Sequence, residues 1–115
     1  MMIRSIEEVL ARLETIIEIK DKIVYDHFTE PQQLPYAAYY YDFTTDGADD
    51  YKGIQWIQFT LELYSDPRNI NLERKILTVL DDVEITSGSD YIETERMYMT
   101  SFRFRFPFKL TSNYP

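Results

Sequence analysis

Apolar and polar residues alternate most regularly in the middle of the chain, over Gly53–Tyr64. Every second position of its second half is apolar: Ile57, Phe59, Leu61 and Leu63. The positions between them are polar: Gln58, Thr60 and Glu62. Successive side chains of a β-strand point to opposite faces, so this spacing predicts a strand with one apolar and one polar face.

Ile54 and Trp56 depart from this alternation, because they fall on the face that is polar further along the strand. Two interpretations account for them. Either a helix of the same chain covers this end of the strand, or Trp56 faces another subunit. Ile54 and Trp56 are therefore candidate interface residues.

Two amphipathic helices are predicted, one near the N-terminus and one after the central strand. Ser5 and Glu8 have the spacing of a capping box, and the first helix is expected over about residues 5–19. Its apolar stripe is Ile6, Val9, Leu10, Leu13, Ile16 and Ile17. Asn69 or Asn71 can cap the second helix. Its stripe is Leu72, Ile76, Val79, Leu80 and Val83.

Three further segments have strand character. Residues 23–28 form a short run, and Tyr36–Phe43 is apolar or aromatic at both parities, as expected of a strand covered on both faces. The last segment, 95–106, alternates between aromatic residues and a side that carries Arg103 and Arg105. Connections are expected at 29–35, 44–53 and 87–90, and a loose tail at about 109–115.

The predicted fold is α+β, in one domain over residues 1–115, with the order α-β-β-β-α-β. A short extra strand near 83–85 is an alternative. Short connections favour antiparallel neighbours, so we expect a mainly antiparallel sheet with both helices on one face. A chain of 115 residues that is 44% hydrophobic can bury such a core without disulfides.

The chain is acidic, with a formal net charge of −8. Lys52 is the only basic residue between positions 31 and 66. Such a protein lacks the cationic stripe that holds a phosphate backbone. The acidic connection also lacks the alternating carboxylates and the final glutamate of a calcium loop, so no metal site is expected.

No pattern of catalytic residues is present, so we expect no enzyme activity and no cofactor. The chain has no cysteine, its single histidine is His27, and its carboxylates show no glycosidase-type spacing. No segment has the length of apolar sequence that crosses a bilayer, and the N-terminus lacks the features of a signal peptide. A soluble, cytoplasmically made protein is the expectation.

The candidate interaction residues are aromatic or cationic. Tyr40 belongs to a tyrosine cluster that suits a core or an interface, and it also permits a ligand-stacking interpretation. Arg103 and Arg105 are too few for nucleic acid and are expected to pair with carboxylates within or between chains. With Ile54 and Trp56, these residues make up the candidate interface.

Several stretches, in order, give the chain a family resemblance. After the first helix come VYDHF, LPYAAYYYDF, YKGIQWIQFTLELYSDPRNINLERKI and DYIETERMYMTSFRFRF. In this arrangement the sequence resembles the tail-terminator, or tail-completion, proteins of long, non-contractile-tailed phages and prophages of Gram-positive bacteria. The resemblance covers nearly the whole chain and includes no catalytic signature.

The resemblance implies a structural protein of the virion neck, assembled in the host cytoplasm. Such proteins form a ring, generally a hexamer, at the head-proximal end of the tail tube, where they end tube polymerisation and join the head connector. The implied partners are other copies of the chain, the major tail tube protein and the connector, with no membrane involved. DNA passes through the ring without specific binding.

The same resemblance gives the acidic residues a role, because carboxylates around a channel would repel DNA phosphates. The candidates for the lumen or for a docking edge are Asp42, Asp46, Asp49 and Asp50. Two alternatives stay open: another head-tail joining protein, such as a head-completion protein, and a small ligand-binding or regulatory module.

Overall fold

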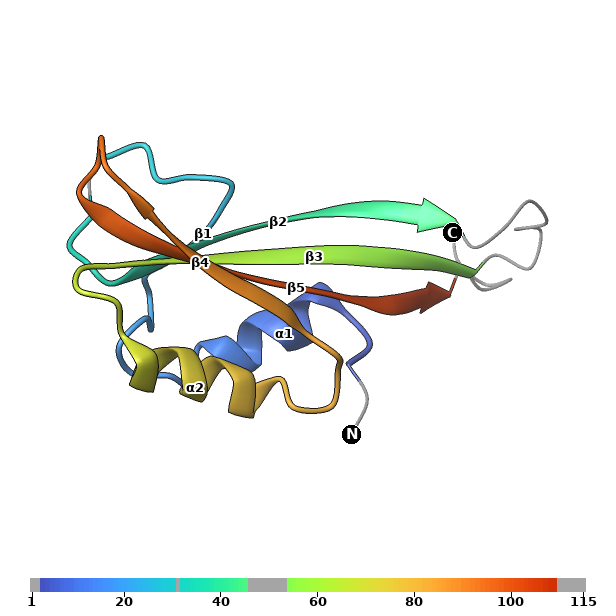
Figure 1. Ribbon diagram of the computed structural model, residues 1–115. Coiled ribbons are helices and arrows are strands. Elements are labelled where there is room, and N and C mark those ends of the chain that lie inside the picture. Colours follow the sequence, from blue (N-terminus) through green and yellow to red (C-terminus); the bar gives the residue numbers. More distant parts are fainter. Residues whose placement is uncertain (1–2, 31, 46–53, 110–115) are drawn as a thin grey trace.

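The computed structural model describes residues 3–30, 32–45 and 54–109, which form a five-stranded mixed sheet with two helices on one face (Figure 1). The helices are α1 (Ile6–Leu13) and α2 (Ile70–Val79). The strands are β1 (Ile23–Tyr25), β2 (Tyr36–Thr45), β3 (Ile54–Ser65), β4 (Thr86–Ile92) and β5 (Met97–Lys109). Their spatial order is β1-β2-β3-β5-β4. The predicted α+β class is confirmed.

The core lies between the helices and the apolar faces of β3 and β5. The alternation predicted for the central strand is confirmed, because all four of its apolar residues are buried: Ile57, Phe59, Leu61 and Leu63. Phe59 stacks between two neighbouring strands, with its ring centroid 5.4 Å from that of Tyr39 and 5.1 Å from that of Phe104. The helices add five buried side chains: Val9, Leu13, Leu72, Ile76 and Leu80.

Both helices begin at side-chain caps. The Ser5 hydroxyl oxygen accepts a hydrogen bond from the Glu8 backbone N–H at 3.1 Å. At α2 the cap is Asn69, whose side-chain oxygen accepts from the backbone N–H of Leu72 at 3.0 Å. These bonds satisfy amide groups that have no partner inside a helix. Of the two predicted caps, Asn69 is therefore the one used.

The first helix is shorter than predicted, since α1 ends at Leu13 and not near residue 19. The next residues, Thr15–Ile17, are all β-branched, and such residues lose rotamer freedom in a helix. The Thr15 hydroxyl donates to the Arg12 carbonyl at 2.6 Å, and the chain continues in tight turns. As a result Ile17, predicted on the buried stripe, is 77% exposed.

The strand arrangement differs from the prediction in β4. Residues 87–90, predicted as a turn, lie inside this strand. The alternative with an extra strand before the last one is the one observed, but the strand spans Thr86–Ile92 and not 83–85. The turn comes later, at 93–96, where Arg96 has a φ of 54°. Ser, Gly and Asp favour turns locally, but pairing with β5 from Thr86↔Arg103 to Ile92↔Met97 overrides this preference at the edge of the sheet.

A second difference is that β1 pairs parallel to β2, with Ile23 opposite Ala37. Antiparallel pairing was expected of strands joined by a short connection. The connecting segment instead passes over the face opposite the helices and returns to the end where β1 begins (Figure 1). A parallel neighbour needs such a crossover, and residues 26–30 and 32–35 contribute to it.

Pro107 lies inside β5, opposite Trp56 on β3, and does not stop the ladder. It lies instead in the part of β5 that is an edge of the described sheet. Pairing of β5 with β4 reaches only Arg103, so beyond that residue β3 is the sole neighbour of β5 among the described strands. Of the predicted tail, Lys109 belongs to β5 and residues 110–115 lie outside the described part.

Arg12 joins the two helices. Its guanidinium donates to both carboxylate oxygens of Asp82, at 2.7 and 3.1 Å, and to the Val79 carbonyl at 3.1 Å. It also pairs with Glu8 at 2.9 Å. This cation therefore compensates the negative C-terminus of α2 and the carboxylate beside it. The hydrogen bonds from Arg12 lower the pKa of Asp82.

We predict that Asp82→Asn destabilises the protein by about 1 kcal/mol at pH 7, because it removes a charge-assisted pair. The pKa of Asp82 is lowered in the folded protein. Its contribution is therefore complete above the ordinary carboxyl pKa of about 3.9 and is lost as the pH falls through the lowered value. Urea denaturation should show the two stability curves converging below about pH 4.

Asp81→Asn is the matched control, since this neighbouring carboxylate is exposed. A difference between wild type and Asp82→Asn that persists undiminished at low pH would contradict the role given to the Arg12–Asp82 pair.

Candidate functional site

The face of the sheet opposite the helices brings together four of the five predicted interface residues. Tyr40, Thr60 and Arg103 form one cross-strand row. Asp42, Gln58 and Arg105 form the next, and Trp56 lies opposite Pro107 beyond it. We call this surface the open face and define it by six residues: Tyr40, Asp42, Trp56, Gln58, Arg103 and Arg105.

Trp56 lies under the side chain of Arg105. The guanidinium carbon is 4.3 Å from the centre of the indole ring, the geometry of a cation–π contact. The ring also borders a cavity of about 360 Å³ with Asp82 and Glu84. No residue of α1 or α2 lines this cavity, but Trp56 is covered within the same chain, by the Arg105 side chain, and the segment that follows α2 lies beside it. The subunit contact stays a prediction.

The indole Nε1–H of Trp56 is buried and finds no acceptor among the described residues. A buried N–H without an acceptor costs free energy, because burial removes its hydrogen bond to water and no protein acceptor replaces it. The open face thus contains an unsatisfied donor beside a cation.

A hydrogen-bonded group lies at the other end of the same face. The Tyr64 hydroxyl donates to one oxygen of Glu62 at 2.7 Å, and the Tyr40 hydroxyl donates to the other at 3.3 Å. Burial, followed by the negative charge and hydrogen bond of Glu62, raises the pKa of Tyr64. The phenol therefore remains a neutral donor, and the carboxylate is held by two hydroxyl groups.

Arg103 and Arg105 are exposed and form no ion pair with a carboxylate of the described residues. The expected pairing inside the chain is thus not observed in this part of the molecule. Asp42 is exposed in the same row as Arg105. Pairing of the two guanidinium groups with carboxylates of another chain, the other expected arrangement, stays a prediction.

Three of the predicted residues lie outside what the structure describes, and a fourth is described only in its backbone. Asp46, Asp49 and Asp50 fall in the segment 46–53. Ile54 is the first residue of β3 and pairs with Lys109, but its side chain is not described. The acidic lumen or docking edge therefore stays a prediction, of which Asp42 alone has a described position.

The single histidine and the carboxylates were candidates for reactive or metal-binding groups. His27 is exposed, with its Nδ1 2.8 Å from an oxygen of Asp26. Across residues 3–30, 32–45 and 54–109, no three His, Asp or Glu side chains gather as metal ligands. No helix in the same ranges has the length and apolar character to cross a membrane.

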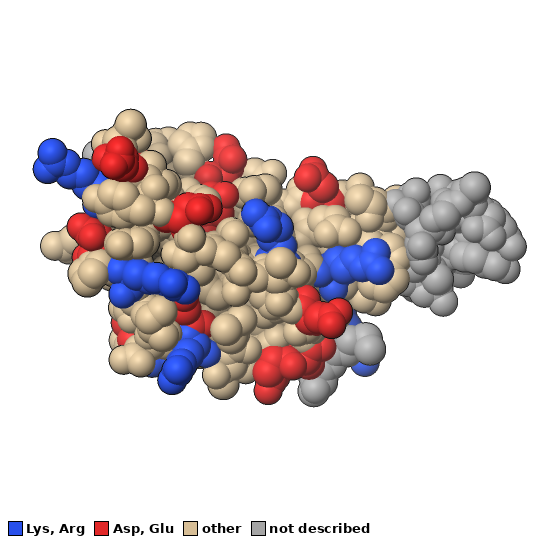
Figure 2. Space-filling model, in the orientation of Figure 1, with Lys and Arg blue, Asp and Glu red and all other residues tan. Residues whose placement is uncertain are grey.

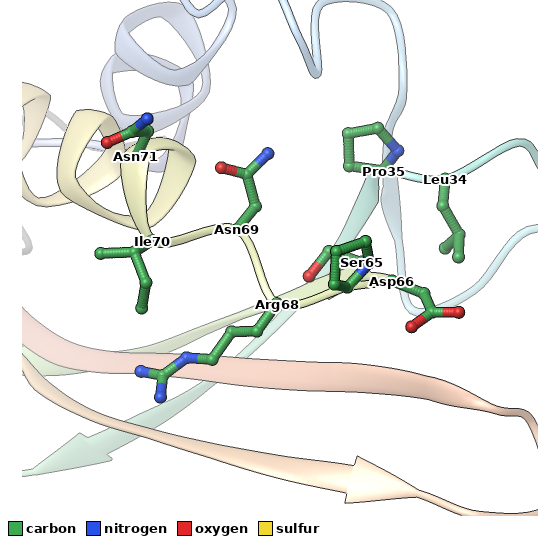
Figure 3. A pocket seen from close by; sticks show the side chains of 9 residues that line it. Leu34, Pro35, Ser65, Asp66, Arg68, Asn69, Ile70 and Asn71 are labelled. Carbon is green, nitrogen blue, oxygen red and sulfur yellow. The ribbon is translucent and has the colours of Figure 1, made fainter.

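A cavity of about 450 Å³ lies at the start of α2 (Figure 3). The Ser65 hydroxyl borders it, buried and without a partner among the described residues. The nearby Arg68 is already engaged, since Nε and Nη2 each donate to Glu73 at 3.0 Å. The Ser65 hydroxyl therefore forms no hydrogen bond to a described base, and the guanidinium nearest to it is held by Glu73.

No protein-family model matches the chain, and no characterised protein matches it significantly. The open face is therefore the main structural guide to function. The alternation of the last strand put Arg103 and Arg105 on its outward side, as observed, whereas the rows that add Tyr40 and Asp42 and the contact of Arg105 with Trp56 depend on a register that a single sequence does not reveal.

We predict that Arg105→Ala shifts the emission of Trp56, the only tryptophan, to longer wavelength, because it removes the group that covers the indole. Global stability should fall by less than about 1 kcal/mol, the usual value of an exposed cation–π pair. Fluorescence and urea denaturation measure the two effects. Arg103→Ala is the control on the same strand face, and an equal shift in both variants would contradict the contact.

Proposed function

We propose that the protein is a structural, non-catalytic subunit that binds other protein chains through the open face. Trp, Tyr and Arg are the residue types enriched at the centres of protein interfaces, and all three occur here on one surface. The observation that carries the proposal is Trp56 half-buried beneath an arginine that forms no ion pair with a described carboxylate. A partner that supplied a carboxylate and an acceptor would satisfy both groups.

The resemblance gives this binding its context: a ring, generally of six copies, at the head-proximal end of a phage tail tube. In that position the protein ends tube polymerisation and joins the tail to the head connector in the virion. The net charge of −8 supports passage of DNA without adhesion. On the side shown in Figure 2, acidic and basic side chains are interspersed and form no cationic stripe.

We predict that Trp56→Gln leaves the fold intact but abolishes assembly into the oligomeric ring, because the indole lies on the sheet face opposite the core and belongs to the open face. Light scattering should be measured on the protein alone and mixed with the tail tube protein, and circular dichroism reports the fold. The matched control is Ile17→Gln, which changes an apolar side chain that is 77% exposed on the helix side.

A wild-type protein that is monomeric in both conditions, or a Trp56→Gln variant that still assembles, would contradict the proposal. Deletion of the gene separates the two neck functions. Overlong tails indicate a tail terminator. Tails of normal length that fail to join heads would instead identify a head-completion protein.

A further inference from the structure

A second cavity, of about 380 Å³, lies where the segment after β1 crosses the sheet. Three parts of the chain that are distant in sequence enclose it: the crossing segment, the paired ends of β2 and β3, and the turn that leads into β5. Ala38, which is only 2% exposed, is part of the lining. Its small side chain leaves room above the strand for a bound group.

Three aromatic side chains, Phe28, Tyr36 and Tyr64, form one part of the wall of this cavity. Tyr36 and Tyr64 stack, with centroids 5.0 Å apart and planes at 26°. Phe28 meets Tyr36 edge-on at 5.5 Å and 88°. Met97 adds a polarizable thioether. Aromatic faces carry negative partial charge, so a wall of this kind attracts a cation that approaches a ring from within about 6 Å.

The charged groups at the cavity have the sign that complements such a cation. Glu30 and Glu95 border it and are exposed, and Asp26 borders it while paired with His27. No lysine or arginine belongs to the described lining. Burial, followed by the negative charge of Glu95, raises the pKa of Tyr36, so this carboxylate acts on the aromatic wall.

Aromatic rings beside carboxylates favour a guanidinium group over a metal ion or an ammonium group. A calcium ion needs six to eight oxygen ligands, and among the described residues no three His, Asp or Glu side chains gather as metal ligands. A guanidinium group is planar, weakly hydrated and able to stack on a ring while it donates to a carboxylate. An ammonium group is more strongly hydrated and loses more on leaving water.

We propose that this cavity, which we call the acidic aromatic pocket, binds an arginine side chain of a partner protein. The guanidinium stacks against the Tyr36 and Phe28 side of the wall and donates to Glu95 or Glu30. The pocket lies at the other end of the same sheet face and shares none of the six residues that define the open face, so it is tested on the isolated protein without a ring or a tail tube. Failure of either proposal thus leaves the other standing.

The test is a titration of ¹⁵N-labelled protein with N-acetyl-arginine amide, followed by NMR. We expect saturable shifts of the backbone signals of Phe28, Tyr36 and Met97, with a dissociation constant on the order of 10 mM. The lysine analogue should bind several-fold more weakly. The citrulline analogue has nearly the same shape without the charge and should produce no saturable shift.

Two variants locate the binding. Glu95→Gln should weaken it about twofold to fivefold, as expected for one partly exposed ion pair. Glu93→Gln lies in the same turn but outside the described lining, and should have no effect. Phe28→Leu keeps an apolar side chain but removes the ring, and should weaken binding further.

Three results would overturn the proposal. They are an absence of shifts with the arginine analogue up to about 50 mM, well above the expected constant, equal binding of the citrulline analogue, and equal losses in Glu95→Gln and Glu93→Gln. The last would show that the ligand responds to overall charge and not to this pocket. The spectra of the variants also report whether each one folds.

Discussion

The register between β3 and β5 is the constraint on which both surfaces of the sheet depend. It runs along the whole of β3 and sets Ile57 opposite Phe106 and Phe59 opposite Phe104. A slip of one residue would turn the phenylalanines of β5 outward and bring Arg103 and Arg105 into the core. Burying an unpaired guanidinium costs far more than any strand pair returns. The same pairing therefore specifies the core and the open face together.

Sequence patterns predicted the parts of the fold that depend on local periodicity. Alternation from Ile57 to Leu63 identified the central strand and its buried face, and Asn69 was one of two caps named for α2. The errors came where tertiary contacts outweigh local preference. The end of α1 is set by a β-branched run, and β4 is a strand because β5 offers it a partner. In both places the free energy of tertiary contacts competes with local conformational preference, and the sequence alone does not show which is larger.

The candidate sites show the same division. Parity put Trp56 on the polar side of the central strand and the two arginines of β5 on the outward side of theirs, but it did not place Tyr40, whose strand is apolar or aromatic at both parities. It could not predict that Arg105 covers Trp56, because that contact joins adjacent rows of a particular register. No sequence pattern indicated the acidic aromatic pocket. Its walls come from the crossing segment, two strand ends and a turn, and the parallel pairing of β1 with β2 was not expected.

The unequal lengths of the strands have a consequence for the backbone itself. β1 pairs with β2 only as far as Tyr39, and β4 leaves β5 at Arg103. Toward the end of the sheet formed by Thr45, Ile54 and Lys109, the described sheet is three strands wide. There the outer main-chain groups of β2 and β5 have no described strand beside them. Pro107 has no N–H to offer, which limits indiscriminate strand addition along β5. A protein that docks on the open face here therefore meets carbonyl and amide groups at both margins, and can extend the sheet as well as cover it.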